Sequence, residues 1–164
     1  MSIRYERASG QYALSYNRAV DEVARERKYL AATSGFSPES SIGLVKRVEE
    51  HNLAQYFAID GEKVVGWCDI FAGYHEGLTH AGTLGMGVLK DYRGQGIGRA
   101  LIRMTIKHAK EICGLEKVEL EVFKSNTAAI ALYESEGFAK EGEKINSRKL
   151  DGKYDNLVVM GRMI

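Results

Sequence analysis

The sequence contains a single proline, two cysteines and no apolar run long enough to form a membrane-spanning helix. Cys68 and Cys113 lack the spacing of metal ligands or of a disulfide framework, which indicates two reduced and mostly buried thiols. Basic and acidic residues nearly cancel, at 23 and 22, so the net charge indicates neither a nucleic-acid nor a membrane partner. Because residues 1–6 lack the apolar core of a signal peptide, we expect a cytoplasmic protein.

The chain has 164 residues, of which 45% are hydrophobic, enough for one compact domain covering residues 1–164. Apolar periodicity and turn signals predict helices and strands in mixed order. Asp-Gly pairs at 60–61 and 151–152 predict hairpin turns. The expected strands cover residues 2–7, 54–59, 63–71, 79–89, 117–123 and 157–160, and the expected helices cover 11–32, 97–113, 128–136 and a segment starting at Pro38.

The most informative segment runs from Tyr92 to Arg99 and places three glycines, Gly94, Gly96 and Gly98, at the expected start of a helix. The N-terminus of a helix carries unpaired N–H donors and a partial positive charge, so it favours phosphate groups. Glycine also lets the backbone approach a bulky pyrophosphate and adopt turn angles that a Cβ forbids. The segment therefore predicts a site for a cofactor that carries a diphosphate.

Two other nucleotide-binding motifs fit this segment less well. The phosphate loop of NTPases ends in Gly-Lys-Ser/Thr, whereas Gly98 is followed by Arg99 and Ala100, which excludes that motif. The dinucleotide fingerprint needs a glycine or alanine where this chain has Arg99, although Glu119 or Glu121 could serve as the ribose-binding acid. A dinucleotide-binding domain therefore stays open as an alternative.

Two motifs in this chain resemble the signatures of the GNAT superfamily of N-acetyltransferases. Residues 93–98, Arg-Gly-Gln-Gly-Ile-Gly, resemble the motif Arg/Gln-x-x-Gly-x-Gly/Ala, which holds the pyrophosphate of acetyl-CoA in that family. Residues 126–138 resemble the second signature, Asn-x-x-Ala-x-x-Leu-Tyr-x-x-x-Gly-Phe, and follow the first after a helix and a strand. The resemblance implies a single-domain α/β (α+β) fold, with a mixed central sheet of about six or seven strands and about four helices.

The resemblance also implies that acetyl-CoA is the co-substrate and that no metal takes part. The backbone of the glycine segment would bind its pyrophosphate, and a splayed or bulged strand just before that segment would bind its pantetheine and thioester carbonyl. Gly85 and Gly87 predict such a bulge. The predicted cofactor-binding residues are Met86, Gly87, Val88, Arg93, Gly94, Gln95, Gly96, Ile97, Gly98, Arg99, Asn126 and Tyr133.

The same resemblance implies two catalytic residues. Tyr133 occupies the position of the general acid, and a phenol with a pKa of about 10 stays protonated at pH 7 and can protonate the leaving thiolate. The acceptor ammonium must also lose a proton, usually to a carboxylate. Glu121 has the spacing of the catalytic base in ribosomal-protein N-terminal acetyltransferases, and Asp69 is the second candidate. Further residues that could line the acceptor mouth are His75, Glu76 and His80.

Simpler structural roles stay open for several of these residues. Tyr133 could be a core aromatic, Gly87 could pack against a bulky neighbour, and Asn126 could act only as a helix cap. Glu121 could be a solvent-facing acid on a strand.

The motifs together predict an N-acetyltransferase that moves an acetyl group from acetyl-CoA to a primary amine by direct attack in a ternary complex. The balanced charge gives no steering toward ribosomes, so a small-molecule acceptor is expected first. A protein N-terminal acetyltransferase and a non-catalytic acyl-CoA-binding module on the same fold are the alternatives. Relatives commonly pair through the edge of the last strands, which implies a homodimer.

Overall fold

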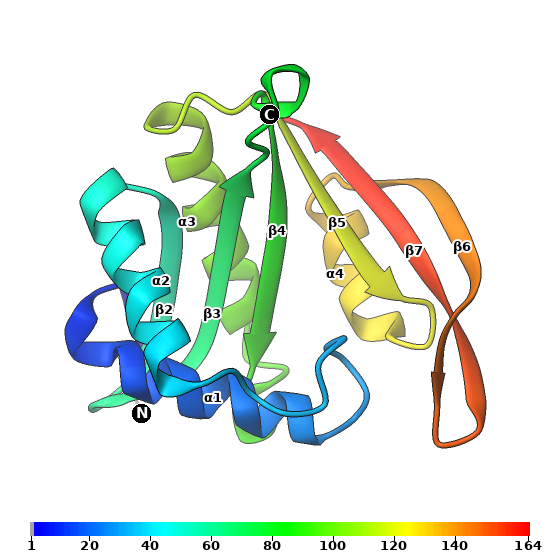
Figure 1. The fold of residues 1–164 in the computed structure, drawn as a ribbon, viewed down its shortest axis with the longest axis horizontal. Helices are drawn as coiled ribbons and strands as arrows, with labels where there is room; N and C mark the ends of the chain where they lie inside the picture. Colours follow the sequence, from blue (N-terminus) through cyan, green and yellow to red (C-terminus); the bar gives the residue numbers. More distant parts are fainter. Residues whose placement is uncertain (1) are drawn as a thin grey trace.

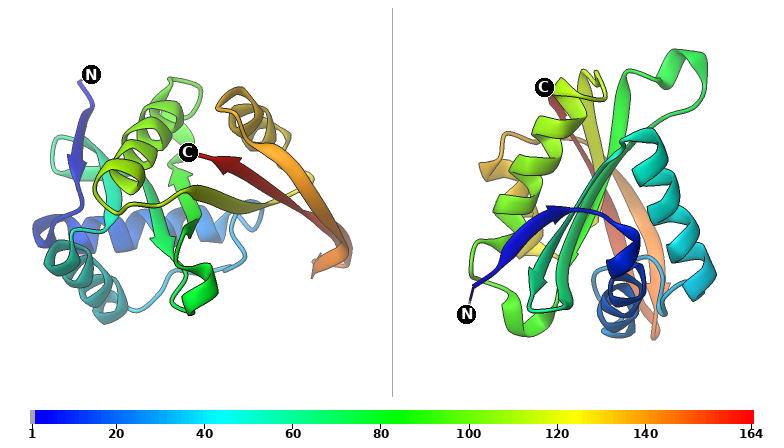
Figure 2. Two further views of the ribbon diagram at one scale, coloured as in Figure 1. Left: turned by 90° about the horizontal axis from the view of Figure 1, so that it is seen from above. Right: turned by 90° about the vertical axis from the view of Figure 1, so that its left-hand side faces the viewer.

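The computed structural model describes residues 2–164 and shows a seven-stranded sheet with two helices against each face (Figures 1 and 2). The strand order is β1-β2-β3-β4-β5-β7-β6. Helices α1 and α2 lie on one face of the sheet, and α3 and α4 lie on the other. The strands are β1 (Arg4–Arg7), β2 (Ala54–Asp60), β3 (Lys63–Ala72), β4 (Ala81–Val88), β5 (Lys117–Phe123), β6 (Ala139–Leu150) and β7 (Lys153–Met163). The helices are α1 (Ala13–Arg25), α2 (Pro38–His51), α3 (Ile97–Glu111) and α4 (Thr127–Ser135).

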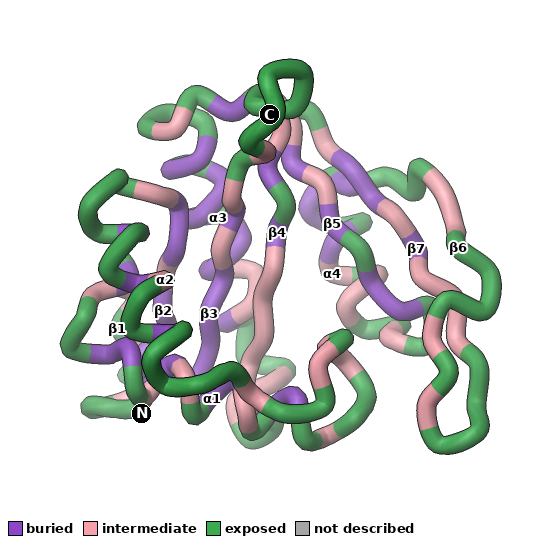
Figure 3. The backbone as a smooth tube through the Cα atoms, in the orientation of Figure 1, coloured by how far each residue is buried: buried purple, intermediate pink, exposed green. Residues whose placement is uncertain are grey.

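This arrangement confirms the predicted α/β (α+β) class and most of the predicted elements. The sequence pattern indicated only the middle of β7 and did not identify β6 as a strand. No residue of β6 is buried, so its side chains show no apolar alternation that could have revealed it. Figure 3 shows this difference between the exposed strand β6 and the buried central strands.

Local signals in the sequence explain several element ends. Ser37 accepts a hydrogen bond from the Ser40 N–H, and Pro38 stands at the first helical position of α2. Asp151 and Gly152, with φ of 53° and 75°, form the two-residue turn between β6 and β7. The other hairpin was predicted to turn at Asp60 and Gly61. Its turn lies one residue later, at Gly61 and Glu62, because Asp60 still belongs to β2.

Helix α1 ends at Arg25, whereas the apolar pattern predicted a helix that continues to residue 32. Arg27 has a φ of 58°, which a right-handed helix does not allow, and residues 26–36 form an irregular segment. Leu30 and Tyr29 pack against the core from this segment without being helical. Their burial produced the periodic pattern, so the longer helix was a wrong prediction.

Strands β4 and β5 are the only parallel pair among the described strands, and they pair only over a short stretch. Their partners run from Ala81 with Lys117 to Thr83 with Glu119. Beyond Thr83 the two strands diverge (Figure 1), while β5 pairs along its whole length with β7. The sheet therefore opens into a V between residues 84–88 of β4 and the second half of β5.

The core lies between the sheet and the helices on both faces. Fully buried side chains include Phe57 and Ile59 of β2, Leu101 of α3, Leu120 of β5 and Met160 of β7. Burial of this kind stabilises the fold through the removal of apolar surface from water. Within residues 2–164, no helix combines the length and the apolar character needed to cross a bilayer.

Candidate active site

A cavity of about 500 Å³ lies where β4 separates from β5. Its walls come from the end of β4, the first turn of α3, the first turns of α4, and the chain at the end of α1 and just after it. It is lined by Val23, Tyr29, Met86, Gly87, Val88, Tyr92, Arg93, Gly94, Gly96, Ile97, Gly98, Arg99, Ser125, Asn126, Thr127, Ala128, Ala129, Leu132 and Tyr133. Its lining residues come from elements on both faces of the sheet (Figure 2), so the cavity lies in the opening between the two strands.

The glycine segment forms one wall through its backbone. Gly94 and Gly96 have φ of 73° and 83°, angles that residues with a Cβ rarely adopt. The turn leads into α3, whose first intrahelical bond runs from the Ala100 N–H to the Gly96 carbonyl. Among residues 2–164, no group accepts a hydrogen bond from the N–H groups of residues 94–99. A run of open N–H donors at a helix N-terminus is suited to a diphosphate.

The side chains of this segment hold the wall in place. The Arg93 guanidinium donates two hydrogen bonds to the Glu26 carboxylate, at 2.9 and 2.6 Å, and one to the Val88 carbonyl at 2.8 Å. This ion pair keeps the pKa of Glu26 below its usual value. Arg93 also stacks over Tyr29, with 4.7 Å between the guanidinium carbon and the ring centroid. Arg93 therefore joins the end of β4 to Glu26, the residue that follows α1.

The remaining predicted residues of this segment take different positions. Ile97 is buried and anchors α3 in the core. Arg99 lines the cavity and forms an ion pair with Glu136 at 2.5 Å. Gln95 is exposed and donates to the Asp91 carbonyl at 3.3 Å, and it does not line the cavity.

The N-terminus of α4 forms the opposite wall, which the sequence analysis identified only in part. The Asn126 carboxamide accepts a hydrogen bond from the Ala129 N–H at 3.3 Å, which confirms the predicted cap. Ser125, Thr127 and Ala128 line the cavity beside it. Two helix N-termini thus face one cavity, and their partial positive charges add at the same place. The Ser-Asn cap signal could have identified this wall in advance.

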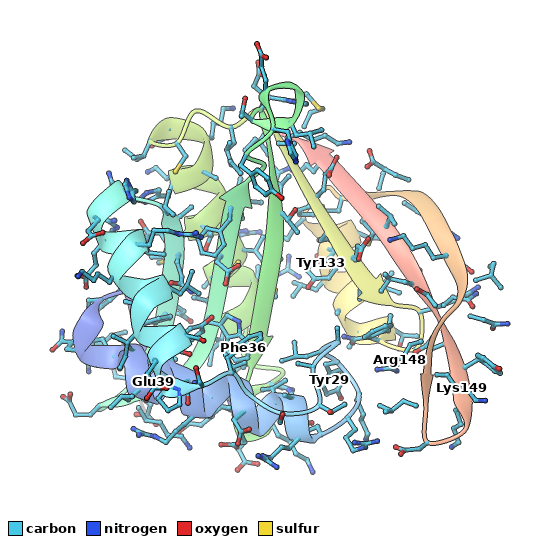
Figure 4. All side chains as sticks on the ribbon, in the orientation of Figure 1. Tyr29, Phe36, Glu39, Tyr133, Arg148 and Lys149 are labelled. Atoms are coloured by element: carbon cyan, nitrogen blue, oxygen red, sulfur yellow. The ribbon has the colours of Figure 1, made fainter. Side chains whose placement is uncertain are left out.

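Tyr133 of α4 lines the cavity where β4 and β5 separate. Its side chain is buried, and its ring meets Phe138 edge-on at 5.9 Å between centroids. Burial raises the pKa of its hydroxyl well above the usual value, so the phenol is protonated at neutral pH. Figure 4 shows Tyr133 in the opening between β4 and β5. The residue therefore has both a core contact and a position from which it can donate a proton.

Of the two roles expected for Gly87 of β4, the structure shows close packing against a bulky neighbour and no bulge toward β3. Strands β3 and β4 pair in unbroken register from Gly66 with Val88 to Ala72 with Gly82, so the predicted bulge is absent from this pairing. A Cβ at Gly87 would overlap the ring of Trp67, whose side chain lies across β4. Gly87 is therefore needed for close packing, while the divergence of β4 and β5 leaves one edge of β4 open.

Replacing Gly87 with alanine is expected to lower the melting temperature, because the added methyl group must push the Trp67 ring out of its place. Overpacking of this kind typically costs about 1–3 kcal/mol of unfolding free energy. The matched control is Gly43→Ala on the exposed side of α2, where a Cβ meets nothing within 4 Å. That change should stabilise the helix by about 0.5–1 kcal/mol. Thermal unfolding measures both, and equal shifts would contradict the packing role.

The two candidate bases lie on the same face of the sheet as α1 and α2. Glu121 of β5 is half-exposed and pairs with the Lys144 ammonium at 2.8 Å. Asp69 of β3 is partly buried and lies opposite Gly85 of β4. Its pKa is raised to about 7 because burial disfavours the charged carboxylate. The residues suggested for the acceptor mouth, His75, Glu76 and His80, are exposed and do not line the cavity.

A model of the acetyltransferase (GNAT) family matches residues 18–138 of this chain. The chain belongs to the acetyltransferase (GNAT) family. The N-alpha-acetyltransferase of Sulfurisphaera tokodaii is 35% identical over 120 residues, which are 66% of this chain and 70% of that protein. The L-amino acid N-acetyltransferase of Escherichia coli is 30% identical over 105 residues, 64% of each. A mycothiol acetyltransferase of Geodermatophilus obscurus is 33% identical over 97 residues, which are only 31% of its length.

Solved structures of GNAT proteins have the same fold. An acetyltransferase of the GNAT family from Streptococcus pneumoniae superposes with a TM-score of 0.92 at 24% identity, covering 99% of this chain and 100% of that one. The phosphinothricin acetyltransferase of Sinorhizobium meliloti, solved with acetyl-CoA, gives a TM-score of 0.90 at 16% identity, covering 100% and 89%. The GNAT resemblance of the two sequence motifs and the predicted GNAT fold are both confirmed.

Proposed function

We propose that this GNAT chain is an acetyl-CoA-dependent N-acetyltransferase that transfers the acetyl group to a primary amine by direct attack in a ternary complex. The observation that carries the proposal is the cavity, whose lining combines the open backbone N–H groups of the glycine segment with the protonated phenol of Tyr133. This arrangement combines a phosphate-binding wall with a proton donor, as acetyl transfer from a thioester requires.

Acetyl-CoA supplies the activated acetyl group and a thiolate leaving group. The N–H groups of residues 94–99 and the N-terminus of α4 would hold its phosphates. The open edge of β4 at residues 86–88 would bind the pantetheine arm and orient the thioester. Tyr133 would donate its proton to the sulfur as the carbon–sulfur bond breaks. Asn126 caps α4 and so positions the helix that carries Tyr133.

For the acceptor, we infer a small-molecule amine. Relatives acetylate L-amino acids and spermidine, as their names state. A second candidate is a protein N-terminus, because the match to the N-alpha-acetyltransferase of Sulfurisphaera tokodaii covers more than two thirds of that protein. The cavity walls described above belong to the part of the site that holds the cofactor, so they fit both acceptor classes.

Two measurements test this function. Calorimetry should detect binding of acetyl-CoA but not of NAD, which separates the GNAT site from the dinucleotide alternative. Release of free CoA should then be measured with a panel of amino acids, polyamines and short peptides with free N-termini. Turnover with an amino acid or a polyamine supports the small-molecule assignment, and turnover with peptides alone supports the second candidate. Binding of acetyl-CoA without turnover of any amine would indicate a non-catalytic module.

The expected homodimer is a separate proposal, which size-exclusion chromatography tests.

A further inference from the structure

The carboxylate of Asp69 lies across the part of β4 that has lost its partner strand. Asp69 pairs with Gly85, two residues beyond the last pair between β4 and β5. A Cβ built at Gly85 would lie 3.1 Å from Asp69 Oδ1, so the carboxylate sits directly over the backbone of β4. The next residues along the strand, 86–88, line the cavity. Asp69 does not itself line the cavity, but it lies opposite Gly85, the residue just before the lining segment of β4, where the thioester would lie in the proposed function.

The buried side chain of Gln55, which pairs with Asp69 from β2, lies on the other side of this carboxylate. Gln55 of β2 is fully buried and donates its carboxamide N–H to Asp69 Oδ2 at 3.5 Å. Its Oε1 atom is buried and forms no hydrogen bond within residues 2–164. A buried carbonyl oxygen without a donor costs free energy, which is expected where a ligand or a water supplies the missing donor. An ammonium group carries three donors and no acceptor.

Tyr16 of α1 completes the surroundings of the carboxylate. The Tyr16 ring meets Trp67, two residues before Asp69 on β3, edge-on at 6.0 Å between centroids, and burial and then the negative charge of Asp69 raise the pKa of the Tyr16 phenol. The groups that face Asp69 are thus the Tyr16 phenol from α1, the Gln55 amide from β2 and the backbone of β4 at Gly85. The thiol of Cys68 is its neighbour on β3, and Asp69 forms no ion pair within the described residues.

We propose that Asp69, with the Gln55 carbonyl beside it, receives the acceptor amine and takes its proton, a role that rests on the proposed acetyl-transfer function. Glu121 is a weaker candidate because its carboxylate is paired with Lys144 and is half-exposed. An acceptor amine could bind the Glu121 carboxylate only after displacing the Lys144 ammonium. The unpaired carboxylate of Asp69 has no such competitor.

The proposed step conserves atoms and charge. The acceptor ammonium gives one proton to the Asp69 carboxylate, directly or through one water, and the resulting amine attacks the thioester carbon. The carbon–nitrogen bond forms, the carbon–sulfur bond breaks, and the phenol of Tyr133 protonates the sulfur. After the attack, the nitrogen loses a second proton to solvent, and solvent returns a proton to the Tyr133 oxygen. Asp69 releases its proton to water, so the products are the amide, free CoA and one proton.

The pH dependence of the reaction gives this base a signature. Because burial raises the pKa of Asp69 to about 7, its carboxylate is the proton acceptor only above that pH. The acetylation rate at saturating acceptor should therefore fall as the pH drops through about 7. The Gln55 N–H stabilises the charged carboxylate and lowers this pKa. Removing that N–H should move the acidic limb of the profile to higher pH.

The test compares pH profiles of wild type, Asp69→Asn, Gln55→Met and Glu121→Gln with one acceptor, so that the ionisation of the amine is common to all. Asp69→Asn should lower kcat by about 10²- to 10⁴-fold and remove the acidic limb. Gln55→Met should keep most of the activity and shift the limb upward. Glu121→Gln should leave the limb in place. Binding of acetyl-CoA, measured by calorimetry, should persist in all three variants.

Each outcome decides the role of Asp69. Loss of the limb in Glu121→Gln, or an unchanged profile in Asp69→Asn, would overturn it and leave acetyl transfer intact. An Asp69→Asn variant that is slow but keeps the acidic limb of the wild-type pH profile would show that Asp69 has only a structural role. That result would also overturn its role as the base. If Asp69→Asn does not fold, the shift in Gln55→Met decides the question. A wild-type protein that binds acetyl-CoA but acetylates no amine would refute the function itself, and the base assignment would fall with it.

Discussion

Replacing Tyr133 with phenylalanine is expected to lower kcat by about 10²- to 10⁴-fold while leaving the affinity for acetyl-CoA nearly unchanged. Phenylalanine keeps the ring that packs edge-on against Phe138, so the core contact survives. It removes only the hydroxyl, whose proton is held firmly because burial raises its pKa. Without that proton the thiolate must leave unprotonated, which raises the barrier of the chemical step.

Three measurements separate chemistry from folding in this variant. Steady-state kinetics give kcat, calorimetry gives the affinity for acetyl-CoA, and thermal unfolding shows whether the core is intact. Tyr12→Phe is the matched control, because Tyr12 is also buried but lies outside the cavity, where its hydroxyl accepts a hydrogen bond from Arg4. The control should keep its activity. Full activity in Tyr133→Phe would remove the phenol from the acid role and leave Tyr133 as a core aromatic.

Replacing Gly96 with valine is expected to weaken the binding of acetyl-CoA by about 10- to 100-fold. With a φ of 83°, position 96 strains any β-branched residue, and relief of this strain must move the N–H groups at the start of α3. A hydrogen bond to a charged group contributes about 1.5–3 kcal/mol, so losing one of them accounts for a change of this size. Calorimetric titration with acetyl-CoA measures it.

Gly114→Val provides the control for backbone strain. Gly114 has a φ of 70°, and a Cβ there meets nothing within 4 Å, but it follows the far end of α3 and does not line the cavity. Both variants should lose stability to a similar extent, and only Gly96→Val should lose affinity. Equal affinity in the two variants would show that the amides of the glycine segment do not bind the diphosphate, and the cofactor site would have to lie elsewhere.

Features that depend on neighbours in the sequence were predictable. The glycines at positions 94, 96 and 98, the Asn126 cap and the turn at Asp151 and Gly152 act within a few residues, because they concern φ angles and first-turn N–H groups. Hydrophobic periodicity identified the buried strands for the same reason. Where exposed residues make a strand, as in β6, or apolar residues pack from an irregular segment, as at Tyr29 and Leu30, periodicity failed.

The roles of individual side chains depended on contacts between distant segments. Arg93 could not be assigned to its ion pair with Glu26, 67 residues away, from any local pattern. For Gly87 the sequence left open a bulge or packing against a bulky neighbour, and the neighbour, Trp67 of the adjacent strand, came from the structure alone. The surroundings of Asp69 combine residues of α1, β2 and β4, and its raised pKa results from burial among them.

The sequence by itself therefore determined the family, most of the helices and strands, and the glycine turn that leaves N–H groups open at the start of α3, because short-range sterics and helix-end chemistry specify these. Only the tertiary structure decided which carboxylate is partly buried and free of an ion pair beside the opened strand. Desolvation and charge pairing depend on what packs around a group in space, and residues far apart in the chain supply those neighbours.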